Sequence, residues 1–395
     1  MKVVLATGIY PPDIGGPATY VKALAEECSR KGMEVAVVTY GRKTEIRNQQ
    51  SATNPKMQNA PAFAEASAGR KCIMHNEDWE VVRVSRFGGP FIRWWRYARA
   101  LRKHAADADI VEAFSSVSVG VPLLLSGLRG VPPKTLLRLG GDFFWERYTA
   151  RGGMKSLREW YASAGSRVFG LRFLMERLLR AFDTVVFSTR FQEELYERSY
   201  RRLPPHRVIE NAFPANVPSV FAPHEPLRLL FVGRFVGFKN LEALVKAMDL
   251  LPNATLTLAG DGPTGWVLRS LAKRHGAPGA IAFREPHEGE EKLRLFAEHD
   301  LLVIPSVTEI SPHTALEARA LGLPVLLTAE TGLSARLSRG IILRTLRTPG
   351  DIRAAVLEVR GNYAAFAREA AGDVPARGWR DVADEHLELF SRLLS

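Results

Sequence analysis

The chain has 395 residues, which is too long for one hydrophobic core and predicts two domains of roughly 150 to 200 residues each. An apolar content of 46% and a charged content of 24% are ordinary for a soluble globular protein. Its two cysteines, Cys28 and Cys72, argue against a disulfide framework and against a cysteine metal site. The first apolar run is too brief for a secretory signal, so we expect a cytosolic protein.

The net charge of +12 is unevenly distributed along the chain. Residues 1–212 hold 33 Lys and Arg against 21 Asp and Glu, whereas residues 213–395 hold 21 of each. Such a basic first half suits an anionic partner, for example a lipid surface or a diphosphate-linked substrate. Nucleic acid is not expected, because the positive charge is dispersed and no recognition module is present.

The first elements in chain order predict a βαβ unit. Residues 2–7 form a buried strand, residues 18–31 a helix and residues 34–40 the next strand, which begins a doubly wound sheet. Gly15 and Gly16 stand in the loop before the helix. Glycines there let backbone N–H groups approach an anion at the positive end of the helix, although a loop that needs positive φ explains them equally well.

The next two segments depart from this alternation. Residues 45–78 lack periodicity and are rich in Ala, Ser, Asn, Gln and Pro, so we expect a disordered insertion. The helix expected at residues 91–104 interleaves aromatic and basic side chains, which favours a peripheral contact with an anionic membrane surface. We favour an amphipathic helix whose aromatics pack on the sheet, because Trp94, Ala98 and Leu101 form a core stripe.

A further strand at residues 136–139 places two polar residues, Arg138 and Asp142, at its carboxyl end. Ligands bind at that end of the strands in doubly wound sheets. A proline-rich stretch at residues 213–226 then marks the domain boundary. Because strands alternate with helices again beyond it, we expect two Rossmann-like domains that face each other across a cleft.

The second half carries two cations just past the strand at residues 228–232. Arg234 and Lys239 lie there, and each would contribute about 1.5–3 kcal/mol through charge-assisted contacts with a diphosphate. The next strand ends in the turn Gly260-Asp261-Gly262-Pro263. Two cations five residues apart also occur by chance. The pair therefore indicates a diphosphate site only in combination with the residues that follow.

Two glutamates, Glu309 and Glu317, stand eight positions apart around the start of a helix. Glu309 falls in the loop that enters the helix, and Glu317 sits on an otherwise apolar face of it. An unpaired carboxylate at such a place costs several kcal/mol, so we expect a polar partner from the protein or a ligand. The simpler alternative is that Glu317 caps a neighbouring loop and Glu309 is solvated.

Four ordered segments resemble the family four retaining glycosyltransferases of the GT-B fold, also called glycosyl transferases group 1. YPPDIGGPATYV resembles the family's glycine loop, FVGRFVGFKN its Arg-Lys segment, LAGDGP its glycine-proline turn and PSVTEISPHTALEARALGLPV its paired glutamates. The resemblance implies domains at residues 1–212 and 213–375, and a closing helix at residues 376–395 that crosses back to the first domain.

The same resemblance implies a role for each motif residue. Arg234 and Lys239 would neutralise the departing diphosphate, Glu309 would lie against the donor sugar, and Glu317 would bind the ribose hydroxyls. These implied catalytic residues are Glu309, Arg234 and Lys239. The donor-binding set is Gly15, Gly16, Arg234, Lys239, Gly262, Ser311, Pro312, His313, Thr314 and Glu317, and the acceptor-side residues are Arg138 and Asp142.

No cofactor and no metal are expected, because the Arg-Lys pair would replace a divalent ion. Two positions depart from the family pattern. Glu112 and Phe114 occupy the segment where many relatives carry a histidine, and Ile310-Ser311-Pro312 replaces the usual Gly-Phe-Gly. These departures concern the choice of sugar and acceptor more than the type of reaction.

We therefore expect a retaining glycosyltransferase that moves a hexose-type sugar from a nucleotide sugar to a glycan or lipid-linked acceptor, in cell-surface polysaccharide or glycolipid synthesis. Attachment to the inner face of the cell membrane through the basic first half is an open alternative to a purely cytoplasmic protein. Two other functions remain open. One is a nucleotide-sugar epimerase or phosphorylase on the same fold, and the other is a non-catalytic binding protein.

Overall fold

The structure is a computed structural model that describes residues 1–13, 15–41, 78–128, 132–163, 166–213, 221–287, 289–372 and 376–395. The insertion expected at residues 45–78 lies outside these residues except for Asp78, as do residues 214–220 of the expected linker. The chain divides into two compact units. The first unit is residues 1–138, 181–184 and 387–395, and the second unit is residues 139–180 and 185–386. The domain boundaries expected from the sequence are a different division and stay a prediction.

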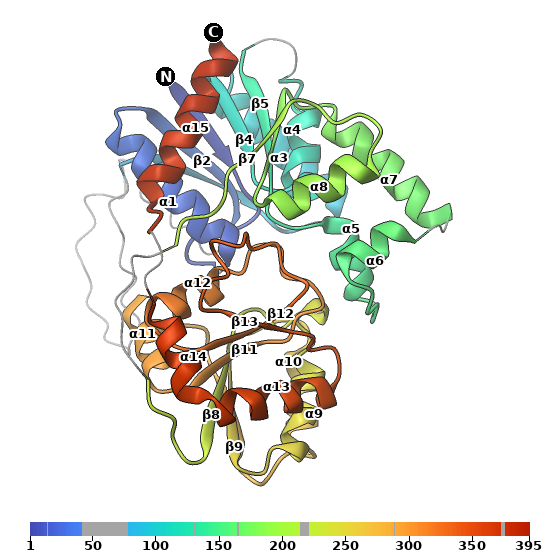
Figure 1. Cartoon of the computed structure of the whole chain (residues 1–395). Helices are drawn as coiled ribbons and strands as arrows, with labels where there is room; N and C mark the ends of the chain where they lie inside the picture. Colours follow the sequence, from blue (N-terminus) through green and yellow to red (C-terminus); the bar gives the residue numbers. More distant parts are fainter. Residues whose placement is uncertain are drawn as a thin grey trace, which may run out of the picture. The chain divides into compact units, whose positions relative to one another are not determined.

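Seven strands form one sheet in the order β3-β2-β1-β4-β5-β6-β7, in which β3 to β5 pair in parallel with their neighbours and β6 pairs in parallel with β7. Near-continuous burial of β1 and β4 reflects their runs of apolar residues, which suit a sheet covered on both faces. Figure 1 labels β2, β4, β5 and β7 of this sheet. Their bounds are β1 Lys2–Ala6, β2 Glu34–Gly41, β3 Glu80–Ser85, β4 Ile110–Ala113, β5 Lys134–Leu139, β6 Thr184–Phe187 and β7 His206–Val208.

Helices connect these strands, and half of those that the structure describes have seven residues or fewer. One is a five-residue π-helical turn, η1, at Ser116–Gly120. Two helices, α6 and α7, lie between α5 and β6. The bounds are α1 Gly16–Arg30, α3 Pro90–His104, α4 Val121–Leu125, α5 Phe143–Thr149, α6 Leu157–Ala162, α7 Ser166–Leu179 and α8 Arg190–Ser199.

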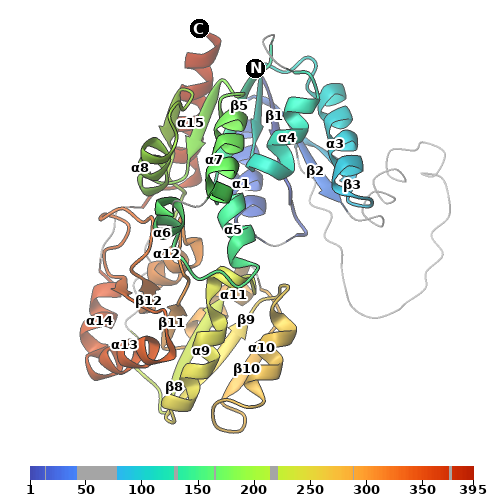
Figure 2. The same cartoon turned by 90° about the vertical axis from the view of Figure 1, so that its right-hand side faces the viewer.

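Six strands form the second sheet, in the order β10-β9-β8-β11-β12-β13. Figure 2 shows α9 and α10 beside its strands β8, β9 and β10. The strands are β8 Leu227–Val232, β9 Ala254–Ala259, β10 Ile281–Arg284, β11 Leu301–Ile304, β12 Val325–Thr328 and β13 Ile342–Arg344. The helices are η2 Gly237–Lys239, α9 Leu241–Ala247, η3 Met248–Leu250, α10 Gly265–Ala272, α11 Gly289–Ala297, α12 His313–Ala320, α13 Pro349–Gly361, α14 Tyr363–Ala370 and α15 Trp379–Leu394.

In each sheet the first three strands of the chain lie side by side in reverse order, β3-β2-β1 and β10-β9-β8. The fourth strand, β4 or β11, then lies on the other side of the first one. In the second sheet this change of side falls between β8 and β11, which pair in parallel at Leu229 and Leu301. Loops that leave neighbouring strands on opposite sides of such a switch point open a binding crevice at the carboxyl edge. The prediction of two Rossmann-like sheets is confirmed.

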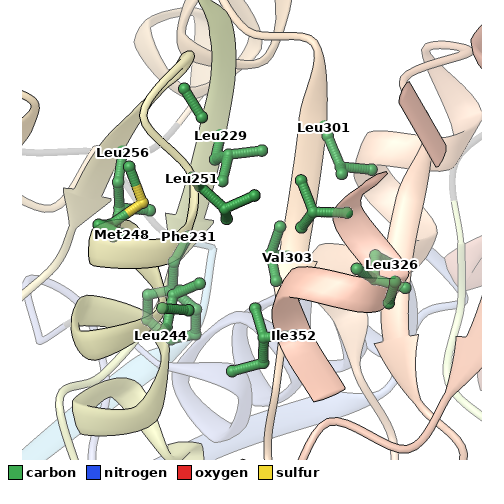
Figure 3. Packing of buried hydrophobic residues seen from close by; sticks show 14 of the residues in the cluster. Leu229, Phe231, Leu244, Met248, Leu251, Leu256, Leu301, Val303, Leu326 and Ile352 are labelled. Carbon is green, nitrogen blue, oxygen red and sulfur yellow. The ribbon is translucent and has the colours of Figure 1, made fainter. Parts of the chain in front are cut away.

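The core of the second sheet lies between its strands and the helices α9 and α13. Figure 3 shows Leu229 and Phe231 of β8, Leu244 of α9, Val303 of β11 and Ile352 of α13 turned toward one another. Each of these five side chains is fully buried. A rigid platform of this kind fixes the strand ends from which the functional loops leave.

Helix α3 corrects one expectation from the sequence. Tyr97, Ala98 and Leu101 are buried, but Trp95 keeps 61% of its surface exposed and Phe91 keeps 79%. The aromatics therefore do not all pack on the sheet, because they are spread around more than one face of the helix. The exposed apolar group at the start of α3 consists of Phe87, Phe91, Ile92 and Trp95.

Candidate active site

The loops that follow β8 and β11 meet in the second unit. The backbone N–H of Val307 donates to the carbonyl of Phe238 at 2.7 Å, which ties the two loops together. The Lys239 ammonium forms an ion pair with the Glu309 carboxylate. The structure thus brings together a cation and an acid that the sequence assigned to one site.

Glu309 is held from several directions. Its side chain is only 7% exposed, and the Ser306 hydroxyl donates to it at 2.5 Å. Its backbone N–H donates to the carbonyl of Glu330 at 2.8 Å, and its own carbonyl accepts from Gly332 N at 2.7 Å. A carboxylate with this many contacts is preorganised, since little rotation is left to it.

Arg234 lies on the surface of the second unit, and glycines fix the backbone beneath it. The backbone N–H of Phe235 donates to the carbonyl of Asp261 at 2.9 Å. A Cβ at Gly262 would lie 2.7 Å from the nitrogen of Phe235 and closer still to its oxygen. Gly262 therefore supports Arg234 through close backbone packing, and its predicted contact with the donor stays a prediction.

Helix α12 begins four residues after Glu309. Its N-terminal residue is His313, and Pro312 occupies the capping position. Ser311 accepts a hydrogen bond from the Asn211 amide at 2.5 Å. The first turn, which contains Thr314, carries no acidic side chain, so the partial positive charge of the helix end is not offset there. This end of the helix favours a negatively charged group.

Glu317 lies in α12 and has a partner that the sequence did not identify. Lys292 of α11 forms an ion pair with its carboxylate, and the two side chains are 20% and 31% exposed. The expectation that Glu317 has a polar partner is met by the protein itself. Its predicted contact with ribose hydroxyls stays a prediction, and would require the carboxylate to share or exchange Lys292.

Asp142 caps helix α5. Its carboxylate accepts hydrogen bonds from the backbone of Trp145 at 2.9 Å, from the Tyr161 hydroxyl at 2.6 Å and from the Tyr196 hydroxyl at 2.8 Å. The residue is 1% exposed. Burial raises the pKa of both phenols well above the ordinary value, so they remain donors. Its predicted contact with an acceptor stays a prediction.

Glu146 of α5 is a candidate site residue that was not predicted from the sequence. It keeps accessible surface, yet the protein around it displaces much of the surrounding water. This desolvation and then the charge of Asp142 raise the pKa of Glu146 to about 7, while Arg234, Lys239 and the backbone N–H of Asp142 act in the opposite direction.

The other predicted residues belong to the first unit. Gly15 is the capping residue of α1, and Gly16 is the first residue of that helix. Arg138 is 3% exposed, with its guanidinium carbon 4.0 Å from the centre of the Tyr20 ring. Their predicted contacts with donor and acceptor stay predictions.

None of the described helices has the length and apolarity needed to cross a bilayer. Across the same residues, no group of three or more His, Cys, Asp or Glu side chains is placed to hold a metal ion.

Sequence reasoning missed Lys292, Ser306 and Glu146 for different reasons. Ser306 directly follows a strand and a proline, and this position at a strand end could have identified it as a candidate site residue. Lys292 lies in an exposed helix that is rich in charged residues, so a lysine at that position does not by itself indicate a functional site. Glu146 lies three residues before the end of a short aromatic helix, and the two cations that act on it, Arg234 and Lys239, lie 88 and 93 residues further along the chain.

Comparison with known proteins assigns the chain to a family. Residues 15–212 match the glycosyl transferase 4-like domain, and residues 213–345 match glycosyl transferases group 1. An uncharacterised glycosyltransferase of Methanocaldococcus jannaschii is 25% identical over 84% of this chain and 82% of that protein. The D-inositol 3-phosphate glycosyltransferase of Mycolicibacterium smegmatis is 30% identical, but the match covers 42% of this chain and 40% of that protein.

Solved structures share the fold at low sequence identity. Sucrose-phosphate synthase from Thermosynechococcus elongatus superposes with a TM-score of 0.73 at 20% identity, covering 99% of this chain and 98% of that one. HepE from Anabaena, solved in complex with UDP-glucose, gives 0.70 at 13% identity and covers 99% of this chain and all of that one. These neighbours confirm the expected GT-B fold. With both family matches on one chain, the protein belongs to the glycosyl transferases group 1 family and is a glycosyltransferase.

Proposed function

We propose that the protein transfers a hexose-type sugar from a nucleoside-diphosphate sugar to a glycan or lipid-linked acceptor, with retention of configuration. The observation that carries this proposal is the grouping of Lys239, Glu309 and the start of α12 in the second unit, with Arg234 on the loop beside them. Three of these features, Lys239, Arg234 and the start of α12, carry full or partial positive charge, which suits an anionic diphosphate. HepE, a structural neighbour, was solved with UDP-glucose, which agrees with a donor of this class.

The chemistry of glycosyl transfer explains the arrangement. As the glycosidic bond to the donor phosphate lengthens, positive charge develops on the sugar ring and negative charge on the leaving phosphate. Lys239 and Arg234 would stabilise the phosphate, and the helix end would add to their effect. Glu309, held by Lys239 and Ser306, would lie against the sugar. We propose that these two cations serve without a divalent metal, and that the leaving phosphate accepts the proton of the acceptor hydroxyl.

The acceptor proposal draws on the first unit. Phe87, Phe91, Ile92 and Trp95 are exposed near the start of α3, and this helix carries five basic residues and no acidic one. Exposed aromatics beside arginines suit the interface of an anionic bilayer. We propose that this surface brings the enzyme to a lipid-linked acceptor at the inner face of the cell membrane, in the synthesis of surface polysaccharide or glycolipid.

Donor binding is the first test. Thermal denaturation of the purified protein with UDP, GDP and ADP should show a stabilising shift for at least one nucleotide. Mass spectrometry against a panel of nucleotide sugars should then detect slow hydrolysis of the matching donor. Absence of any nucleotide shift would favour the non-catalytic binding protein, whereas donor isomerisation without acceptor would favour the epimerase.

A further inference from the structure

Helix α5 is docked against the loop that carries the predicted diphosphate-binding cations. The rings of Trp145 and Phe238 lie 5.4 Å apart. A Cβ at Gly237 would lie 2.5 Å from the carbonyl oxygen of Thr149, so the two backbones approach each other at van der Waals distance. Glu146 sits one turn before Thr149, and its carbonyl accepts from the Thr149 hydroxyl at 3.0 Å. This packing places α5, the helix of Glu146, against the segment that ends at Lys239, and the charges of Arg234 and Lys239 act on the Glu146 carboxyl.

The carboxyl of Glu146 folds back over Gly141. A Cβ at that position would collide with Glu146 Oε1, so the glycine leaves the space that the carboxyl occupies. The Gly141 carbonyl accepts from the Gln192 amide at 3.1 Å, which fixes the peptide beneath it. The orientation of Glu146 therefore follows from its surroundings, although its own side chain is long and flexible.

The second unit gathers more acid than base around the predicted diphosphate position. Three carboxyl groups, Asp142, Glu146 and Glu309, share this region with two cations, Arg234 and Lys239. Asp142 is held by three hydrogen-bond donors, and Glu309 by Lys239 and Ser306. A diphosphate would bring further negative charge. Glu146 is the carboxyl best placed to become neutral, because desolvation already disfavours its charged form, the backbone N–H of Asp142 is the donor that acts on it, and solvent can reach it.

We propose that Glu146 takes up a proton from solvent when the diphosphate of a nucleotide sugar binds at Arg234 and Lys239. This inference rests on the donor binding proposed above. In the step, a proton leaves bulk water and forms an O–H bond on the Glu146 carboxylate, and no other bond changes. The neutral carboxyl then no longer repels the diphosphate, so Glu146 acts as a positioning residue for the donor.

The electrostatics agree with this direction. In the free protein the pKa of Glu146 is about 7, raised by desolvation and by Asp142 and held down by Arg234 and Lys239. A bound diphosphate would offset those two cations, so the pKa of Glu146 rises further in the complex. Glu309 faces Lys239, and its negative charge does not reverse the upward shift in the pKa of Glu146. Affinity for the donor is therefore highest below about pH 7 and falls as the pH rises through that value.

The test measures donor affinity as a function of pH with the full chain. Calorimetric titrations with UDP-glucose, GDP-mannose and ADP-glucose would run from about pH 6 to about pH 8.5, because a diphosphate esterified at both ends lacks the phosphate ionisation near pH 6. The dissociation constant of the wild-type protein should rise about tenfold over this range. That of Glu146→Gln, which mimics the neutral acid, should change by less than about twofold.

Two further variants complete the design. Glu194→Gln removes an exposed carboxylate of α8 that pairs with Arg198, and should keep the wild-type pH profile. In Gly141→Ala the new methyl group displaces the Glu146 carboxyl, which can move because it is the end of a flexible side chain. The protein should stay folded, and the midpoint of the pH profile of donor affinity should move. It also serves as the test if Glu146→Gln does not fold.

The outcomes separate the two proposals. If the wild-type protein binds none of the nucleotide sugars, donor binding fails and the inference fails with it. If the wild-type protein binds a donor but Glu146→Gln shows the same pH profile, only the role of Glu146 is overturned. Proton uptake can be read independently, because the binding heat of the wild-type protein then depends on the ionisation enthalpy of the buffer and that of Glu146→Gln does not.

Discussion

Lys239 and Glu309 lie 70 residues apart in the chain and form an ion pair with side chains only 19% and 7% exposed. Each belongs to a loop at the carboxyl end of a strand, and those strands, β8 and β11, are neighbours at the switch point of the second sheet. The pair therefore marks the position where ligands of doubly wound sheets bind. It also gives Glu309 a compensating charge while no donor is present.

Lys239→Met should lower donor turnover by about 100-fold or more, because one of the groups that stabilise the leaving phosphate is lost. The same change leaves Glu309 without its cation and should reduce the free energy of unfolding by about 1–3 kcal/mol. Adding Glu309→Gln should restore most of the stability and none of the turnover. Urea unfolding and donor hydrolysis measure the two quantities, and a double variant as unstable as the single one would contradict the pairing.

Gly262→Ala should destabilise the protein by about 1–3 kcal/mol, because the new methyl group would overlap the backbone of Phe235. Donor affinity should fall as well, since Arg234 precedes Phe235. Gly361→Ala is the matched control, because a Cβ there meets no atom within 4 Å and lies at the end of α13. The control should be neutral or slightly stabilising. Equal thermal midpoints for the two variants would refute the packing role of Gly262.

Asp142→Asn distinguishes a structural role from an acceptor contact. Two phenols and one backbone amide donate to the Asp142 carboxylate, so we expect a loss of about 1–3 kcal/mol in unfolding free energy. Tyr196→Phe should show about half of that loss. If Asp142 instead contacts the acceptor, Asp142→Asn would raise the KM for acceptor and leave the stability unchanged.

The raised pKa of Glu146 also predicts how stability depends on pH. The folded pKa of about 7 exceeds the ordinary value of 4.5, so the folded protein binds the proton more tightly than the unfolded chain. This contribution is complete below pH 4.5 and is lost as the pH rises through about 7. Because the carboxyl meets solvent, we expect an effect on the order of 1 kcal/mol. Denaturation near pH 5 and pH 8 should show this loss in the wild-type protein and not in Glu146→Gln.

Membrane contact through α3 is tested by Phe91→Ser with Trp95→Ser. The double variant should bind anionic vesicles at least about tenfold more weakly, because it removes two of the exposed apolar side chains. Trp266→Ser is the control, since Trp266 is 76% exposed on α10 of the second unit. Co-sedimentation at low and high salt separates the apolar and charged contributions. Wild-type protein that stays in the supernatant at low salt would reject the surface.

Much of the site could be predicted because it follows strand ends. Arg234 and Lys239 follow the buried strand β8, and Glu309 follows the strand β11. Strand position is local information, since runs of buried apolar residues and the glycines after them are visible in one segment. The two sheets could be foreseen for the same reason, and the family matches agree with the motifs that indicated them.

The partners of those residues could not be predicted in this way. The aromatic helix α3 shows the limit, because spacing could not tell which of Trp94, Trp95 and Tyr97 would be buried. Asp142 shows the same limit. A carboxylate that follows a strand looks the same in the sequence whether it binds a ligand or accepts hydrogen bonds from two phenols.

The sequence by itself determined the alternation of strands and helices, the place of each motif at a strand end, and the excess of positive charge in residues 1–212. The tertiary structure alone decided that Lys292 pairs with Glu317, that Gly262 supports Phe235, and that Glu146 shares its surroundings with Arg234 and Lys239. The physical reason is distance along the chain. Periodicity reports which face of an element is buried, whereas charge pairing and desolvation depend on which distant segment covers that face.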